Sequence, residues 1–213
     1  LDSHRKAAAA TAAGAFDREI VILDVTDKDG NAQRHARDEG IRADASLEGL
    51  GALKTITADG VVTAGNASQI CDGASGILIV SERALKAHNL TPLARIDTMT
   101  VTAGDPVIML MEPIPATLRA LERSGRTIAD IDLAEVNEAF APVPMAWLRD
   151  TGADPARLNV NGGAIALGHP LGASGAKLMA TLVHALRARG LRYGLQTMCE
   201  GGGIANATII EAL

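Results

Sequence analysis

The feature that most constrains the fold is an alternation of strand-length apolar runs with segments of helical spacing, which fills the chain after residue 60. The strand-like runs cover residues 76–80, 94–102, 133–136, 193–198 and 205–210, and the helical patterns cover 82–88, 115–123, 139–149 and 170–189. Strands that alternate with helices predict an α/β architecture. Because only a glycine-rich turn joins the last two runs, we also expect an antiparallel hairpin, and hence a mixed sheet.

The first part of the chain is more polar and follows a different pattern. An alanine-rich helix is expected over residues 2–13, and a strand over 19–26 that leads into a turn at Asp27–Gly30. Irregular charged sequence over 33–42 and a short helix over 46–53 follow. We therefore expect two units, residues 1–60 and residues 61–213.

Composition narrows the class of protein. Apolar residues make up 47% of the chain but aromatic residues only 2%, so Ala, Val, Ile and Leu must build the core. A net charge of −5 argues against a nucleic-acid partner, because no basic face is available to neutralise phosphates. No apolar run approaches the roughly 20 residues that cross a bilayer, so no membrane partner is expected. Two widely separated cysteines, Cys71 and Cys199, indicate no disulfide framework and predict a cytoplasmic location.

The clearest indication of chemistry is His169, which lies in the glycine-rich stretch Asn161–Lys177. Glycines let the backbone approach a ligand closely and adopt positive φ. Pro170 suits the first turn of a helix, and the positive end of a helix dipole disfavours protonation of a histidine beside it. His169 is therefore a candidate neutral base or hydrogen-bond donor for a polarised carbonyl group. A loop histidine satisfied by backbone groups is the structural alternative.

Cys199 is the second candidate, because it ends an alternating run and directly precedes the turn Gly201–Gly203. A free thiol has a pKa of about 8.5, within the range that neighbouring donors can adjust. The bare backbone N–H groups of the glycines, Gly201 first, are suited to hold an oxyanion. Burial as a packing residue is the commoner fate of a single cysteine, but a core does not need three successive glycines. Cys71 has no such setting, and we assign it to packing.

Asn137 and Glu138 precede a predicted helix. The usual function of an asparagine in that place is to cap the helix N-terminus, which is the structural alternative for Asn137. Glu138 is expected to fix its loop by hydrogen bonding.

Three motifs in one order carry a family resemblance: Asn-Glu-Ala-Phe at 137–140, Gly-His-Pro-Leu-Gly at 168–172 and Cys-x-Gly-Gly-Gly at 199–203. Together they closely resemble the C-terminal half of the thiolases, the acetyl-CoA acetyltransferases and 3-ketoacyl-CoA thiolases. The resemblance extends to residues 3–10, 62–68 and 72–74, and so covers essentially the whole chain. It implies the C-terminal half of a layered αβαβα architecture, with a mixed five-stranded sheet between helices.

The resemblance also implies an activity, the cleavage or formation of 3-oxoacyl-CoA by Claisen chemistry. Coenzyme A is then a co-substrate, and neither a permanently bound cofactor nor a metal is expected. Cys199 would be the acid and base at the α-carbon, His169 would activate the nucleophilic thiol, and Asn137 would hold an oxyanion water. The residues that the resemblance assigns to coenzyme A are Ser68 and Ala64 in the pantetheine channel, Arg42 on the adenine, and Ala139 and Phe140 beside the thioester.

The acyl-carrying cysteine of thiolases belongs to their N-terminal half, and Cys71 does not match it because it lies after Ser68. We therefore expect that the N-terminal half is absent and that residues 1–60 are part of the loop domain over the active site. On this expectation the chain alone lacks the acyl-accepting cysteine. An inactive thiolase-like module that binds coenzyme A or serves as a scaffold is the alternative. The family implies a homodimer or homotetramer, and Glu200 and Ala205 leave the acyl-chain length open, sterol side chains included.

Overall fold

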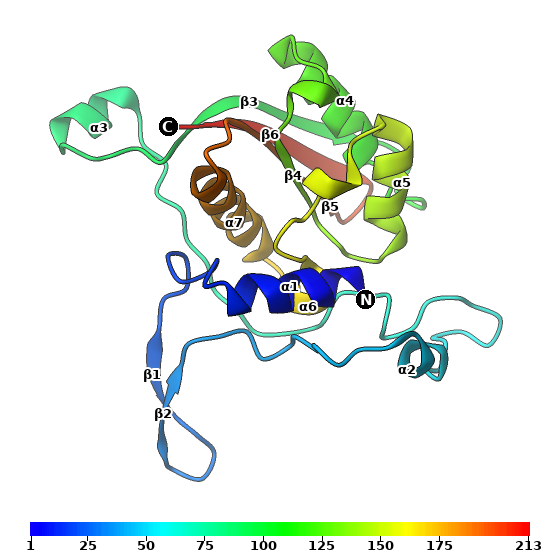
Figure 1. Cartoon of the computed structure of the whole chain (residues 1–213). Helices are drawn as coiled ribbons and strands as arrows, with labels where there is room; N and C mark the ends of the chain where they lie inside the picture. The colour runs from blue at the N-terminus through cyan, green and yellow to red at the C-terminus, as the bar shows by residue number, and fades with distance from the viewer.

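The computed structural model describes all 213 residues, and a four-stranded mixed sheet in the order β3-β6-β5-β4 forms its centre (Figure 1). Strand β6 (Ile204–Ala212) pairs antiparallel with both β3 (Ala94–Ala103) and β5 (Tyr193–Glu200). Strand β5 pairs in parallel with β4 (Leu133–Val136). The predicted mixed α/β sheet is confirmed. In place of a full fifth strand, Leu158 makes a single parallel bridge to Ala134.

Helices cover both faces of this sheet. Helix α4 (Pro113–Ser124) and helix α5 (Pro142–Thr151) pack on one face, where Trp147 is completely buried. Helix α7 (Ser174–Arg189) covers the other face through Leu182 and Leu186. Because side chains alternate along a strand, Leu133, Glu135 and the following Asn137 lie on the α7 side of β4.

The first helix, α1 (Asp2–Ala12), lies against the short helix α6 (Ala164–Leu167) (Figure 1). Ala7 and Ala10 pack with Phe16, Ala166 and Leu167 in a small separate core. The loop before α6 approaches α1 so closely that a Cβ on Gly162 would lie 2.7 Å from the carbonyl oxygen of Ser3. The N-terminal helix thereby supports the glycine-rich loop from below.

The remaining elements are peripheral. Strands β1 (Leu23–Thr26) and β2 (Ala32–His35) form an antiparallel hairpin, and α2 (Leu47–Gly51) and α3 (Glu82–Ala87) are short helices. Two 3-10 turns, η1 (Ile128–Asp130) and η2 (Pro155–Arg157), complete the chain. The irregular structure expected over residues 33–42 is wrong at its start, where strand β2 forms. The carboxylate of Asp27 accepts hydrogen bonds from the N–H groups of Asp29 and Asn31, which closes the turn and lets the flanking residues pair.

Two further expectations differ from the structure. The predicted strand over 76–80 does not form, because no neighbouring strand pairs with this exposed segment. The predicted helix over 170–189 begins only at Ser174, since Gly172 adopts a φ of +84° that a helix does not accept. Pro170 therefore lies in a turn and not in the first turn of the helix. The helix expected over 139–149 likewise begins at Pro142.

Candidate active site

The site is assembled at the ends of two neighbouring parallel strands. Val136 pairs with Thr197, and the Asn137 N–H donates to the Thr197 carbonyl at 3.1 Å. Cys199 follows two residues later on β5, so Asn137 and Cys199 emerge at the same edge of the sheet. His169 meets this edge, since its Nε2 lies 3.3 Å from Nδ2 of Asn137. The structure therefore joins two motifs that are 32 residues apart.

The hydrogen bonds of His169 indicate its tautomer. Its Nδ1 lies 2.5 Å from the hydroxyl oxygen of Ser174, and that hydroxyl donates to the Pro170 carbonyl at 3.0 Å. Because the only hydroxyl proton of Ser174 is thus used, Nδ1 carries the proton and donates to Ser174. Nε2 is then an acceptor that faces the Asn137 amide. Ser174 was not expected from the sequence, although a hydroxyl at the start of the following helix was a usable signal.

Burial lowers the pKa of His169, and the charge of Lys177 lowers it further. The expected neutral imidazole is therefore supported by these two causes. The helix dipole is not the main one, because helix α7 begins five residues after His169.

Asn137 is not a helix cap. Helix α5 has Ala141 at its N-cap position, where no side chain accepts a hydrogen bond. The Asn137 side chain is only 1% exposed and points to His169, while its Oδ1 has no hydrogen-bond partner. The alternative interpretation of Asn137 as a helix N-cap is therefore wrong.

Glu138 fixes the glycine-rich loop, as expected. Its Oε2 accepts hydrogen bonds from the Ser3 hydroxyl at 2.6 Å and from the Ile165 N–H at 3.1 Å, and its Oε1 accepts from Nδ2 of Asn159 at 3.2 Å. A Cβ on Gly163 would lie 2.3 Å from the carboxyl carbon of Glu138. A larger residue here would therefore push the carboxylate away from its hydrogen-bond partners.

Cys199 is a partly buried free thiol opposite Ala205 in the β5–β6 hairpin. Burial raises the pKa of its thiol, and the charge of Glu200 adds to this effect. The thiol is therefore protonated at neutral pH, and the neighbouring donors that the sequence suggested do not reverse this. No hydrogen bond joins Cys199 to His169 or Asn137.

The turn after Cys199 depends on its glycines. Gly202 and Gly203 have φ values of +79° and +82°, and a Cβ on Gly203 would lie 2.9 Å from the carbonyl oxygen of Asp105. Gly201 is exposed, with open space where a Cβ would stand. The turn therefore presents bare backbone beside the thiol.

The residues assigned to coenzyme A lie close together with one exception. Ser68 donates its N–H to the Ala139 carbonyl at 3.0 Å, and Ala67 forms a bridge with Phe140. Ala64 is exposed in the adjoining turn, which Asn66 closes by accepting from the Thr63 N–H at 2.8 Å. Arg42 is exposed on a different segment.

Gln69 connects that segment to the site, and the sequence did not reveal it. Its Nε2 donates to the carbonyls of Gly40 at 2.9 Å, Ile165 at 2.7 Å and Ala166 at 3.1 Å. Its own carbonyl accepts the N–H of His169 at 3.0 Å. Gln69 thus links the segment before Arg42, the segment after Ser68 and the histidine loop.

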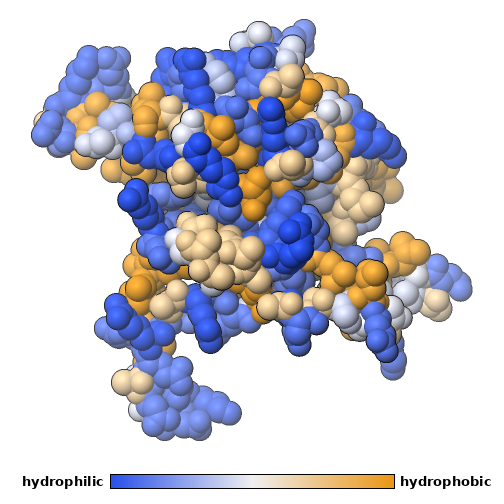
Figure 2. Space-filling view, viewed as in Figure 1, coloured by the Kyte–Doolittle hydropathy of each residue, from blue (hydrophilic) through white to orange (hydrophobic).

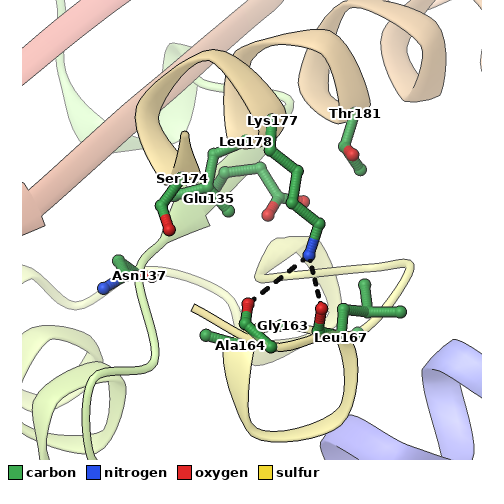
Figure 3. A pocket seen from close by; sticks show the side chains of 11 residues that line it. Glu135, Asn137, Gly163, Ala164, Leu167, Ser174, Lys177, Leu178 and Thr181 are labelled. Atoms are coloured by element: carbon green, nitrogen blue, oxygen red, sulfur yellow. Dashed lines mark hydrogen bonds between the residues drawn. The ribbon is translucent and has the colours of Figure 1, made fainter. Parts of the chain in front are cut away.

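A small cavity lies between helix α7 and the glycine-rich loop that precedes His169 (Figure 3). Its walls include Glu135 and Asn137 from the end of β4, and Ser174, Lys177 and Thr181 from α7. The Lys177 ammonium donates to the carbonyls of Leu167 at 2.9 Å and Gly168 at 3.5 Å, as the dashed lines show. Glu135 and Lys177 were also missed by sequence reasoning. A larger cavity beside Trp147 contains none of the expected site residues.

These observations define an α/β domain with an imidazole, a carboxamide and a thiol at one sheet edge. Comparison with known proteins places it in a family. The profile of the thiolase C-terminal domain matches residues 90–212, and that of the thiolase N-terminal domain matches residues 1–83. The chain belongs to the thiolase family.

Individual relatives agree with this assignment. Over its whole length the chain is 54% identical to a steroid 3-ketoacyl-CoA thiolase of Mycobacterium tuberculosis and 49% identical to an acetyl-CoA acetyltransferase of Escherichia coli. It covers 51% and 54% of these proteins. The chain thus spans about half the length of the curated relatives that it matches.

Solved structures of relatives also superpose closely on this chain. An acetyl-CoA acetyltransferase of Bacillus anthracis superposes with a TM-score of 0.92 at 40% identity, over 99% of this chain and 54% of that one. Human mitochondrial 3-ketoacyl-CoA thiolase in complex with CoA superposes with a TM-score of 0.90 at 43% identity, over 100% of this chain and 53% of that one. None of the helices in the present structure combines the length and apolarity that crossing a membrane requires.

Proposed function

We propose that this sequence supplies the C-terminal catalytic half of an acyl-CoA C-acyltransferase, which cleaves or forms 3-oxoacyl-CoA with coenzyme A as co-substrate. The observation that carries the proposal is the contact between His169 and Asn137 at the sheet edge where Cys199 also emerges. The residues proposed for catalysis are His169, Cys199, Asn137 and Gly201.

In the cleavage direction, a cysteine of the N-terminal thiolase half attacks the C3 carbonyl, and its proton passes to Nε2 of His169. The bond between C2 and C3 breaks, and its electron pair forms the enolate of acetyl-CoA. Cys199, protonated because it is partly buried, donates its proton to C2 of this enolate. Coenzyme A then takes the acyl group from the first cysteine, and the proton of its thiol passes to the Cys199 thiolate. The released cysteine thiolate takes back its proton from Nε2 of His169. Splitting the reaction through an acyl-enzyme makes each step easier.

Oxygen atoms that gain negative charge need hydrogen-bond donors. The Asn137 amide, with His169 once it is protonated at Nε2, is suited to one thioester oxygen, directly or through a water. The N–H of Gly201 is suited to the other, because the turn leaves open space around it. Both groups would stabilise a transition state more than the ground state.

We further propose that residues 1–60 cover coenzyme A and that residues 61–213 form the C-terminal domain. Ser68, Ala64, Ala139 and Phe140 line the pantetheine and thioester part, and Arg42 contacts the adenine. The human relative in complex with CoA supports coenzyme A as the ligand. Since one relative is named for steroid 3-ketoacyl-CoA, a sterol-derived acyl chain is the first to compare with a short one. We propose a cytoplasmic homodimer or homotetramer, to be tested by fractionation and light scattering.

The test is a thiolysis assay in the natural protein that contains this sequence, with 3-oxoacyl-CoA and coenzyme A. His169→Ala should lower kcat/KM by about 100-fold to 10,000-fold, because a general base is lost. His88→Ala, a change of an exposed histidine on the periphery, is the control and should leave the rate unchanged. Full activity of His169→Ala would contradict the proposal, and so would an inactive wild type.

A second test uses the 213-residue chain alone. Because the acyl-accepting cysteine is proposed to lie in the N-terminal half, incubation with acetyl-CoA should give no acetyl adduct. Mass spectrometry of the intact chain measures this. In the structure Cys71 is exposed beside Gly168, so its assignment to packing is wrong. A stable adduct on Cys71 would overturn the proposal that this chain lacks the acyl-accepting cysteine.

A further inference from the structure

The cavity between α7 and the glycine-rich loop is lined by two buried oxygen atoms without hydrogen-bond partners. They are Oε2 of Glu135 and Oδ1 of Asn137, and each residue is only 1% exposed. The two residues are separated by one position at the end of β4, so their side chains lie on the same face of the sheet. A buried polar atom without a partner costs about 1–3 kcal/mol, so a pair of them on one cavity indicates a bound polar ligand.

The same cavity offers a hydrogen-bond donor. The ammonium of Lys177 has three N–H groups, and two of them are directed to the carbonyls of Leu167 and Gly168. Figure 3 shows the Lys177 side chain reaching down from α7 past Glu135 to this loop. One donor therefore remains for a ligand between Glu135, Asn137 and Lys177.

The size and the chemistry of the cavity identify the ligand. Its volume is about 10 Å³, which is the room that one water molecule needs. A buried water makes about three hydrogen bonds, and the cavity provides two oxygens and one donor. An anion would meet two oxygen atoms, and an organic group would not fit.

We propose that one water molecule is bound between Glu135, Asn137 and Lys177, and that Glu135 is thereby a positioning residue for Asn137. The water donates one hydrogen bond to Oδ1 of Asn137, which turns Nδ2 of the amide toward His169. The opposite amide orientation would place Oδ1 against Nε2 of His169, where two acceptors repel each other. This inference rests on the proposed function only for the importance of Asn137 in catalysis.

The charged groups around the cavity favour a neutral Glu135. Burial raises its pKa well above the usual range, and the charges of Glu138 and Glu19 raise it further, against the opposing charge of Lys177. Glu19 faces the same region from the segment after α1, and burial raises its pKa to about 7. The charge of Asp38, in the segment between β2 and α2, opposes the lowering of the Lys177 pKa by burial. A neutral carboxylic acid can both donate to and accept from the water.

The first test is a high-resolution crystal structure of the unmodified natural protein. We expect density for one water within hydrogen-bond distance of Oε2 of Glu135 and Oδ1 of Asn137. Continuous protein density without a water between these atoms would overturn the site. This measurement requires neither a variant nor activity, so it decides the inference even if the proposed function fails.

The second test compares Glu135→Gln with Glu135→Leu. The glutamine keeps a neutral polar group, so we expect the water, the nitrogen-15 signals of the His169 ring and kcat to stay within about twofold of wild type. The leucine should lose the water, shift the His169 ring signals and lower kcat about tenfold at unchanged KM, as loss of an oriented donor does.

Val136→Ala on the opposite face of β4 is the control for general destabilisation. A leucine variant that matches the glutamine variant in ring signals and kcat would overturn the positioning function. If the leucine variant does not fold, the glutamine variant decides alone. A Glu135→Gln protein that loses the water, or more than twofold in kcat, would overturn the positioning function.

Discussion

At the scale of single residues, Lys177 influences both the position and the protonation state of His169. Lys177 donates to the carbonyls of the two residues directly before His169 and lowers the pKa of the imidazole by its charge. The cation thus holds the loop and adds its charge to the effect of burial, which is the larger cause of the lowered His169 pKa. Neither function is visible from the sequence, where Lys177 is one polar position in a helix.

Replacement of Lys177 separates charge from shape. Lys177→Met should raise the pKa of His169, whereas Lys177→Arg, which keeps the charge, should leave it near the wild-type value. Titration of the imidazole by NMR measures both. An unchanged pKa in the methionine variant would show that burial alone keeps His169 neutral.

Glu19 gives the fold a pH dependence of its own. Burial raises its pKa to about 7 from the ordinary 4.5, so between these values the folded chain binds a proton that the unfolded chain has released. The contribution of Glu19 to the free energy of unfolding should therefore fall as pH rises from about 4.5 to about 7. His169 acts in the opposite sense, because its lowered pKa disfavours the folded state as pH falls through about 6.5.

Denaturant unfolding at several pH values tests this dependence. Glu19→Gln should make the free energy of unfolding fall less steeply between pH 4.5 and 7 than in the wild type. Asp24→Asn in the exposed β1 strand is the control and should leave the slope unchanged. Equal slopes in wild type and Glu19→Gln would contradict the buried, proton-binding carboxyl.

At the level of elements, the site depends on how the glycine-rich loop is attached to the sheet. Glu138 ties residues 163–165 to the end of β4, and Ser3 on α1 adds a hydrogen bond from the opposite side. The loop that presents His169 is thus held from β4 and α1, and also from α7 through Lys177.

Gly163 tests this attachment. In Gly163→Ala the new Cβ would lie 2.3 Å from the carboxyl carbon of Glu138, so we expect a loss of about 1–3 kcal/mol in the free energy of unfolding. Gly51→Ala in helix α2 has nothing within 4 Å of the new Cβ and should be neutral or stabilising by up to about 1 kcal/mol. Equal stability of the two variants in thermal unfolding would contradict a close approach of Glu138.

The spacing of apolar residues predicted the helices and strands whose buried face is formed by that same spacing. Strand β4 was expected at its observed bounds, and α4 and β3 were expected within a few residues, because apolar spacing reports the buried face directly. The segment 76–80 has an equally good strand pattern but no partner to pair with. His169 and Asn137 were found through their motifs. Ser174, Glu135 and Gln69 were not, because their function arises only when α7, β4 and the loop meet.

At the scale of the whole molecule, many large apolar side chains are exposed. Leu78 and Ile79 are 79% and 63% exposed, and Val107 is 91% exposed. Figure 2 shows apolar patches among polar areas, including one on the side that carries α2. Exposed apolar patches mark surfaces that associate with other protein.

We therefore expect the isolated 213-residue chain to self-associate as its concentration rises. Light scattering at increasing concentration measures the average mass, and Leu78→Lys combined with Ile79→Lys should reduce it. A chain that stays monomeric at all concentrations would contradict this expectation.

The two cysteines allow the most direct test of the central claim, that Cys199 exchanges protons with the α-carbon of an acyl-CoA beside His169 and Asn137. In the natural protein, Cys199→Ala should lower the rate of 3-oxoacyl-CoA thiolysis by about 100-fold or more, as loss of a general acid does. Cys71→Ala is the matched control and should stay within about twofold of the wild type, because this exposed thiol lies beside Gly168 but has no proton transfer assigned to it. Undiminished thiolysis in Cys199→Ala would contradict the account.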